Sequence, residues 1–129
     1  MGRFLDKAKE LRANTEIHFN CTQAVLIPFA EVCGISEEAA AQLGANFGGG
    51  MKMGSVCGVV TGGLMVLGLA GVDDVKTVNA FCRKIRNNHN GTLMCSELLR
   101  MNAERGGEKK PHCDAMVYEA VELLEEILA

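Results

Sequence analysis

Residues 56–72 form a run of 17 residues without a charged side chain, and Asp73 and Asp74 close it. A run of this length lies at the short limit for a membrane-spanning helix. Five glycines dilute its hydrophobicity, at positions 58, 62, 63, 68 and 71. We therefore expect a buried helix at the centre of the protein, with no insertion into a membrane.

Helical periodicity dominates the remaining sequence, and no segment shows the alternating pattern of a β-strand. The expected helices span roughly residues 2–13, 20–34, 36–47, 55–71, 74–89, 92–101 and 113–129. Pro28 should kink or split the second helix, and residues 102–112 should form a loop. A chain of 129 residues without a linker or an internal repeat suits one domain. The sequence predicts an all-α, single-domain compact bundle over residues 1–129, with about six or seven helices around a glycine-rich central helix.

Local signals mark several of the expected helix ends. Asn20 and Ser36 are good N-caps, and Gly34 suits the position that follows a helix end. Glycines recur every fourth residue at positions 54, 58 and 62, which lets another backbone approach closely. We expect that neighbour to be a helix of the same chain, and a homodimer contact is the alternative.

The charges indicate neither a nucleic-acid partner nor a secreted protein. The 13 basic and 16 acidic residues give a net charge of −3, and the basic clusters are short. Charges from Arg3 onward interrupt any apolar region of a signal peptide. We therefore expect a cytoplasmic, reducing location, where cysteines serve in redox chemistry or metal binding more often than in structural disulfides.

Four of the six cysteines, Cys21, Cys57, Cys95 and Cys113, lie at or near the expected amino ends of helices. The partial positive charge of a helix amino end stabilises a thiolate, which is the form that attacks a disulfide or binds a metal. We expect Cys57, at the start of the central helix, to have a lowered pKa and to act as the nucleophile.

The other two cysteines, Cys33 and Cys82, are expected only to pack. Cys33 lies at a helix carboxy end, where the dipole disfavours a thiolate. Cys82 shares the spacing of an apolar helix face with Val75, Val78 and Ile85.

Neither local metal motifs nor nucleotide motifs are present. The chain has no C-x-x-C pair, and the glycines of residues 48–54, which we expect to form a flexible turn, match neither a Walker A loop nor a Rossmann turn. His18 and His112 lie close in sequence to Cys21 and Cys113, so either could serve as a base or a metal ligand. His89 is expected to complement a helix carboxy end.

Several segments together resemble one family. They are residues 20–25 (NCTQAV), 47–51 (FGGGM), 57–62 (CGVVTG), 65–69 (MVLGL), 95–98 (CSEL) and 120–124 (AVELL). Over residues 20–128 the chain resembles the C_GCAxxG_C_C family of redox-active proteins. The four cysteines that define this family fall on Cys21, Cys57, Cys95 and Cys113, and Val59 replaces the alanine of its motif. The resemblance implies a redox role and names no substrate.

Three hypotheses follow. The first is thiol–disulfide exchange or electron transfer through the four cysteines, as in a thiol-dependent oxidoreductase with a redox partner protein. In the second, the same four cysteines are ligands of an iron–sulfur cluster or of zinc. In the third, the chain is a helical interaction module whose sulfurs merely pack.

Overall fold

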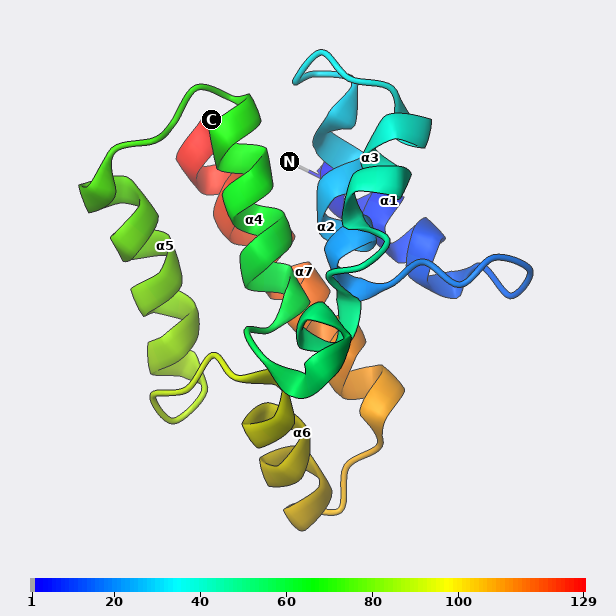
Figure 1. The fold of residues 1–129 in the computed structure, drawn as a ribbon, viewed down its shortest axis with the longest axis vertical. Helices are drawn as coiled ribbons and strands as arrows, with labels where there is room; N and C mark the ends of the chain where they lie inside the picture. Colours follow the sequence, from blue (N-terminus) through cyan, green and yellow to red (C-terminus); the bar gives the residue numbers. More distant parts are fainter. Residues whose placement is uncertain (1) are drawn as a thin grey trace.

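The computed structural model describes residues 2–129, which form seven α-helices and one short π-helical turn (Figure 1). In chain order these are α1 (Gly2–Ala13), α2 (Cys21–Ala30), α3 (Glu37–Gly44), η1 (Gly50–Gly54), α4 (Gly58–Leu69), α5 (Val75–Asn88), α6 (Cys95–Glu104) and α7 (Lys109–Leu128). Within these residues the only β-type pairing is a single bridge between Val56 and Met94. The all-α prediction is therefore confirmed.

Three helices, α2, α4 and α7, share the centre of the bundle. Helix α7 packs against α1, α2, α4, α5 and α6, and α2 packs against α1, α3, α4 and α7. In Figure 1, α4 lies between α5 on one side and α2 on the other, with α7 behind it. The expectation of one glycine-rich central helix is thus only partly right. Helix α2 carries no charged residue and continues through Pro28 to Ala30, so the expected split at Pro28 does not occur.

The glycines of α4 let it approach α2 closely. A Cβ added at Gly62 would lie 2.9 Å from the carbonyl oxygen of Thr22, and one added at Gly58 would overlap the Thr22 hydroxyl. That hydroxyl donates a hydrogen bond of 2.9 Å to the carbonyl of Gly58. Gly54, in contrast, lies outside α4, at the end of η1, where it faces Ser96. The close approach expected for the glycine pattern therefore occurs within one chain at two of its three positions.

The sequence located some helix ends and missed others. Asn20 and Ser36 cap α2 and α3, and Gly34 takes a left-handed backbone with φ 87° after α2. Helix α7 begins at Lys109, four residues before the expected start. Pro111 falls in its first turn, where an amide hydrogen has no partner within the helix, so the ring is tolerated there.

The uncharged run of residues 56–72 supplies only the 12 residues of α4 to a helix. Among the residues described, none of the helices combines the length and the apolar character needed to cross a membrane.

Candidate functional site

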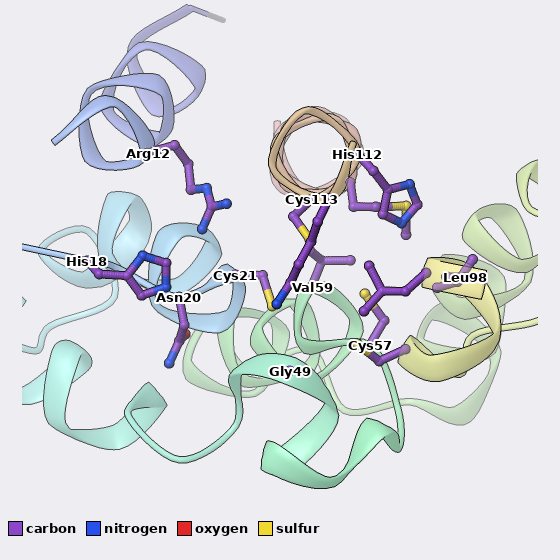
Figure 2. Close-up of a pocket in the computed structure, with 14 residues that line it drawn as sticks. Arg12, His18, Asn20, Cys21, Gly49, Cys57, Val59, Leu98, His112 and Cys113 are labelled. Atoms are coloured by element: carbon purple, nitrogen blue, oxygen red, sulfur yellow. The ribbon is translucent and has the colours of Figure 1, made fainter. Parts of the chain in front are cut away.

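One pocket brings Cys21, Cys57, Cys95 and Cys113 together, with a volume of about 110 Å³. Each comes from a different helix: Cys21 and Cys95 are the first residues of α2 and α6, Cys57 is the N-cap of α4, and Cys113 lies in α7. Figure 2 shows Cys21, Cys57 and Cys113 reaching into the space between these helices. All six cysteines of the chain are free thiols.

The four thiols differ in exposure. Cys57 and Cys95, called the inner pair below, are 7% and 9% exposed. Cys21 and Cys113, the outer pair, are half-buried. The outer pair is therefore the more exposed of the two pairs.

A short backbone pairing holds the inner pair in place. The bridge between Val56 and Met94 is antiparallel, and its two hydrogen bonds run from the Cys57 amide to the Leu93 carbonyl and from the Cys95 amide to the Ser55 carbonyl, each 2.7 Å long. Each cysteine directly follows a bridge residue, so both side chains leave the pairing on the same face. The bridge thus fixes the starts of α4 and α6 side by side.

Glycines make room for two of the sulfur-bearing side chains. A Cβ at Gly58 would overlap Cys21 Sγ, and a Cβ at Gly50 would lie 2.9 Å from the Cβ of Cys95. Gly50 begins η1, in which Met51 and Lys52 take left-handed backbone conformations with φ near 60°. Such conformations are costly for residues other than glycine and are typical of functional segments. The turn expected over residues 48–54 is therefore a strained turn with left-handed backbone, packed against Cys95.

A capping box positions Cys21. The Asn20 side chain accepts from the Gln23 amide at 2.8 Å, and the Gln23 side chain accepts from the Asn20 amide at 2.9 Å. The same two side chains donate to carbonyls of α3, from Asn20 to Gly44 at 3.0 Å and from Gln23 to Ala41 at 2.7 Å. The start of α2 is therefore tied to α3 as well as to α4.

Burial, and not the helix dipole, dominates the acidity of the inner pair. Burial raises the pKa of Cys57 to about 12, and the nearby thiols of the other three pocket cysteines add to the rise. The Val59 amide acts in the opposite direction but is outweighed. Burial likewise raises the pKa of Cys95. The expected lowering of the Cys57 pKa is therefore wrong, because desolvation disfavours a thiolate more than the helix end favours it.

Cys113 occupies the fifth position of α7 instead of its start, so the dipole argument fails there too. Burial raises its pKa, and Cys21 adds to the rise, whereas the positive charges of Arg12 and Lys109 lower it. Arg12 is only 8% exposed. Its guanidinium donates to Asp114 at 2.6 Å and to the Phe19 carbonyl at 2.9 Å.

Sequence reasoning missed the two cations that line the pocket, Arg12 and Lys109. A signal for Arg12 was present, because it follows the buried Ala8 by four residues and so shares the apolar face of α1. Lys109 gave no such signal, since residues 102–112 were expected to be a loop.

The three histidines have separate environments. His18 and His112 both line the pocket, and burial lowers the pKa of His112, which favours its neutral form. His89 lies 2.7 Å from a carboxylate oxygen of Glu119 and does not line the pocket. Two histidines therefore stand near the thiols, as their sequence positions indicated.

Cys33 and Cys82 lie outside the pocket and are half-buried, in the turn after α2 and in α5. Burial raises the pKa of both. The apolar face expected around Cys82 differs in one member, because Val75 is 72% exposed, whereas Ile85 is buried and Val78 is half-buried.

The fit of the pocket to a metal is limited in the geometry described. Over residues 2–129, no three or more His, Cys, Asp or Glu side chains are arranged to hold a metal ion. Four thiols are nevertheless the donor set that zinc and iron–sulfur clusters use.

Comparison with known families adds a finding that geometry cannot supply. A family model described as "Putative redox-active protein (C_GCAxxG_C_C)" matches residues 19–127, a span that contains all four pocket cysteines. Searches among curated proteins and among solved structures give no match.

Proposed function

The chain belongs to the C_GCAxxG_C_C family of redox-active proteins, and from that premise we propose that it performs thiol–disulfide exchange through Cys21, Cys57, Cys95 and Cys113. The observation that carries the proposal is the single pocket lined by all four thiols. A cytoplasmic, reducing location would keep these thiols reduced between reactions.

The outer pair makes the first contact with the oxidant. Cys21 and Cys113 are the half-buried members of the pocket, and Figure 2 shows their side chains extending toward the same space from α2 and α7. Burial raises the pKa of Cys113, and the positive charges of Arg12 and Lys109 offset part of that rise. This combination supports Cys113 as the attacking sulfur and Cys21 as the resolving one, in place of Cys57.

The inner pair supplies two further electrons when Cys57 and Cys95 are oxidised to a disulfide. Cys57 and Cys95 are buried, and the backbone bridge places them as diagonal neighbours on one face. Among the three pairings that four cysteines allow, the similar exposure within each pair supports Cys21 with Cys113 and Cys57 with Cys95.

The reaction balances as a two-electron exchange. A thiolate of the outer pair attacks a disulfide of the redox partner, forms a mixed disulfide and releases one partner thiol. The second outer thiol then attacks the protein sulfur of that mixed disulfide and releases the other partner thiol. Two protein thiols are oxidised to one disulfide, the partner disulfide is reduced to two thiols, and the two protein protons end on the partner thiols.

Stepwise oxidation tests this function. A Cys33→Ser/Cys82→Ser variant keeps only the four pocket thiols, and it is titrated anaerobically with a small disulfide and mapped by mass spectrometry without reduction. We expect a Cys21–Cys113 disulfide first and a Cys57–Cys95 disulfide at higher oxidant. Four thiols that stay reduced, or that link only between chains, would contradict the proposal.

Metal analysis of the same preparation separates this function from the cluster hypothesis. Protein purified without oxygen should contain less than one equivalent of zinc or iron and no sulfide. Stoichiometric metal that is lost on Cys57→Ser, with retained metal on Cys82→Ser, would replace disulfide exchange by ligation.

A further inference from the structure

A second cavity, called the side cavity below, adjoins the pocket at Cys113. Its volume is about 290 Å³, and it shares Arg12, His18, Lys109 and Cys113 with the pocket as common lining residues. Cys113 is the one cysteine that lines both spaces. A molecule in this side cavity would therefore lie directly against the sulfur proposed to attack.

The side cavity is positively charged in a chain that is negative overall. Arg12, Lys109 and Lys110 line it, and none of its lining residues is acidic, although the chain carries a net charge of −3. One carboxylate, that of Asp114, pairs with two of these cations, Arg12 and Lys110. Lys109 has no ion-pair partner among residues 2–129. Three cations against one carboxylate leave a positive excess beside Cys113.

We propose that the side cavity binds the anionic group of a small, carboxylate-bearing disulfide and presents one of its sulfurs to Cys113. The inference rests on the proposed function and names the substrate class for the same site. The volume suits a small molecule, since cavities of roughly 300 Å³ lie at the lower end of ligand pockets. Fixed positive charge near a reacting group raises the local concentration of an anion.

The electron balance follows that of the exchange reaction. The Cys113 thiolate attacks the sulfur nearer to it, the disulfide bond of the substrate breaks, and one carboxylated thiolate leaves. Cys21 then attacks Cys113 Sγ, and the second carboxylated thiolate leaves. One substrate disulfide is reduced to two thiols while Cys21 and Cys113 are oxidised to one disulfide. The two cysteine protons go to the departing thiolates.

A pair of small disulfides that differ in charge tests the inference. Both probes react with the Cys33→Ser/Cys82→Ser variant: the dianionic 5,5′-dithiobis(2-nitrobenzoate) and the neutral 4,4′-dithiodipyridine. Lys109→Glu reverses the unpaired charge, and Lys84→Glu on α5 makes the same change at an exposed residue that lines neither cavity. Circular dichroism checks that both variants remain helical.

We expect Lys109→Glu to slow the dianionic probe by roughly fivefold or more, as expected for the loss and reversal of one close charge in water. The neutral probe should slow clearly less than the dianionic one, and only because Lys109→Glu also removes a charge that lowers the Cys113 pKa; Lys84→Glu should affect neither probe. The rate with the dianionic probe should also fall with added salt.

Two failures are distinguishable. Equal sensitivity of both probes to Lys109→Glu, or no sensitivity of either, would overturn the anion site and leave disulfide exchange standing. If neither probe produces a disulfide among the four pocket cysteines, the proposed function fails, and the substrate class fails with it.

Discussion

The inner and outer pairs place the same chemical group in two different environments. At the inner pair, the starts of α4 and α6 are joined by two backbone hydrogen bonds, and their thiols are almost fully buried. At the outer pair, α2 and α7 approach α1, and the Arg12 guanidinium is bound to Asp114 next to Cys113. Position at a helix end is similar for three of the four cysteines, yet burial raises the pKa of two of them, Cys57 and Cys95.

The difference shows that solvent access and nearby charge outweigh the helix dipole in this pocket. A helix end contributes roughly 0.3–1 kcal/mol near a surface. Full burial can move a pKa by about 3–5 units, each worth roughly 1.4 kcal/mol. Burial therefore raises the pKa of both inner thiols, while the outer pair remains half-exposed to solvent.

The largest expected contrast is in thiol alkylation. Burial raises the Cys57 pKa from 9.0 to about 12, which leaves on the order of 1000-fold less thiolate below pH 9. The higher nucleophilicity of a more basic thiolate recovers part of this, so Cys57 should react with iodoacetamide roughly 30-fold or more slowly than an exposed cysteine. Timed labelling and peptide mass spectrometry measure this, with urea-unfolded protein as the control. Labelling of Cys57 as fast as Cys113 would remove the distinction between the pairs.

The raised pKa of Cys57 also predicts how the free energy of unfolding changes with pH. Because the folded-state pKa of Cys57 lies above its unfolded value, the unfolded chain loses this proton first as pH rises. The contribution of the protonated Cys57 thiol to the free energy of unfolding is fully present below about pH 9 and is lost between about pH 9 and 12. Urea titrations of the wild type should show this decline, and Cys57→Ala should lose that part of it. An unchanged slope in Cys57→Ala would assign the decline to other groups.

The next contrast compares two glycines of α4, of which only Gly58 leaves space for a thiol of the outer pair. A Cβ at Gly58 would overlap Cys21 Sγ, so Gly58→Ala should destabilise the fold by about 1–3 kcal/mol through overpacking. At Gly68 a Cβ would meet no atom within 4 Å, so Gly68→Ala should be neutral or stabilising by up to about 1 kcal/mol. Chemical denaturation compares the two. Similar values for both variants would show that α2 and α4 do not depend on the close approach at Gly58.

The sequence predicted the helix ends that depend on neighbouring residues. Asn20 and Ser36 cap their helices, and each has a side chain that accepts from a backbone amide three residues later. Such caps depend only on neighbouring residues, which is why they can be read in advance. The expected helix boundaries failed at Pro111, since a proline before a helix and one in its first turn look alike in sequence.

The pocket itself depends on contacts between distant segments. Position along the chain indicated which four cysteines belong together, and the family resemblance agreed with it. The bridge of Val56 and Met94 left no strand pattern, because it consists of one residue pair. The burial of Cys57 follows from that pairing and from the packing of α4 on α2, so its acidity could not be derived from its place at a helix end.

Replacement of Arg12 tests how a positive charge beside Cys113 affects stability and thiol reactivity, and the expected effect is smaller. Arg12→Gln removes a buried guanidinium that bonds Asp114 and the Phe19 carbonyl, so it should cost about 1–3 kcal/mol in unfolding free energy. It should also slow alkylation of Cys113, because one charge that lowers that pKa is gone. Arg100→Gln is the matched control, since its pair with Glu104 is exposed and worth at most about 0.5 kcal/mol. Faster labelling of Cys113 in Arg12→Gln would show that Arg12 shields the thiol instead of activating it.

The smallest effect should come from the cysteines outside the pocket. Cys82 is half-buried against the core and lines neither the pocket nor the side cavity, so Cys82→Ser should change the unfolding free energy by about 1 kcal/mol or less. The rate and the extent of disulfide formation in the pocket should stay at the wild-type level, measured by the same non-reducing peptide map. Cys113→Ser is the contrasting variant, because it removes the sulfur proposed to attack and should abolish the outer disulfide while the fold remains. If Cys82→Ser lost pocket oxidation as Cys113→Ser does, exposure and pocket membership would not explain which thiols react.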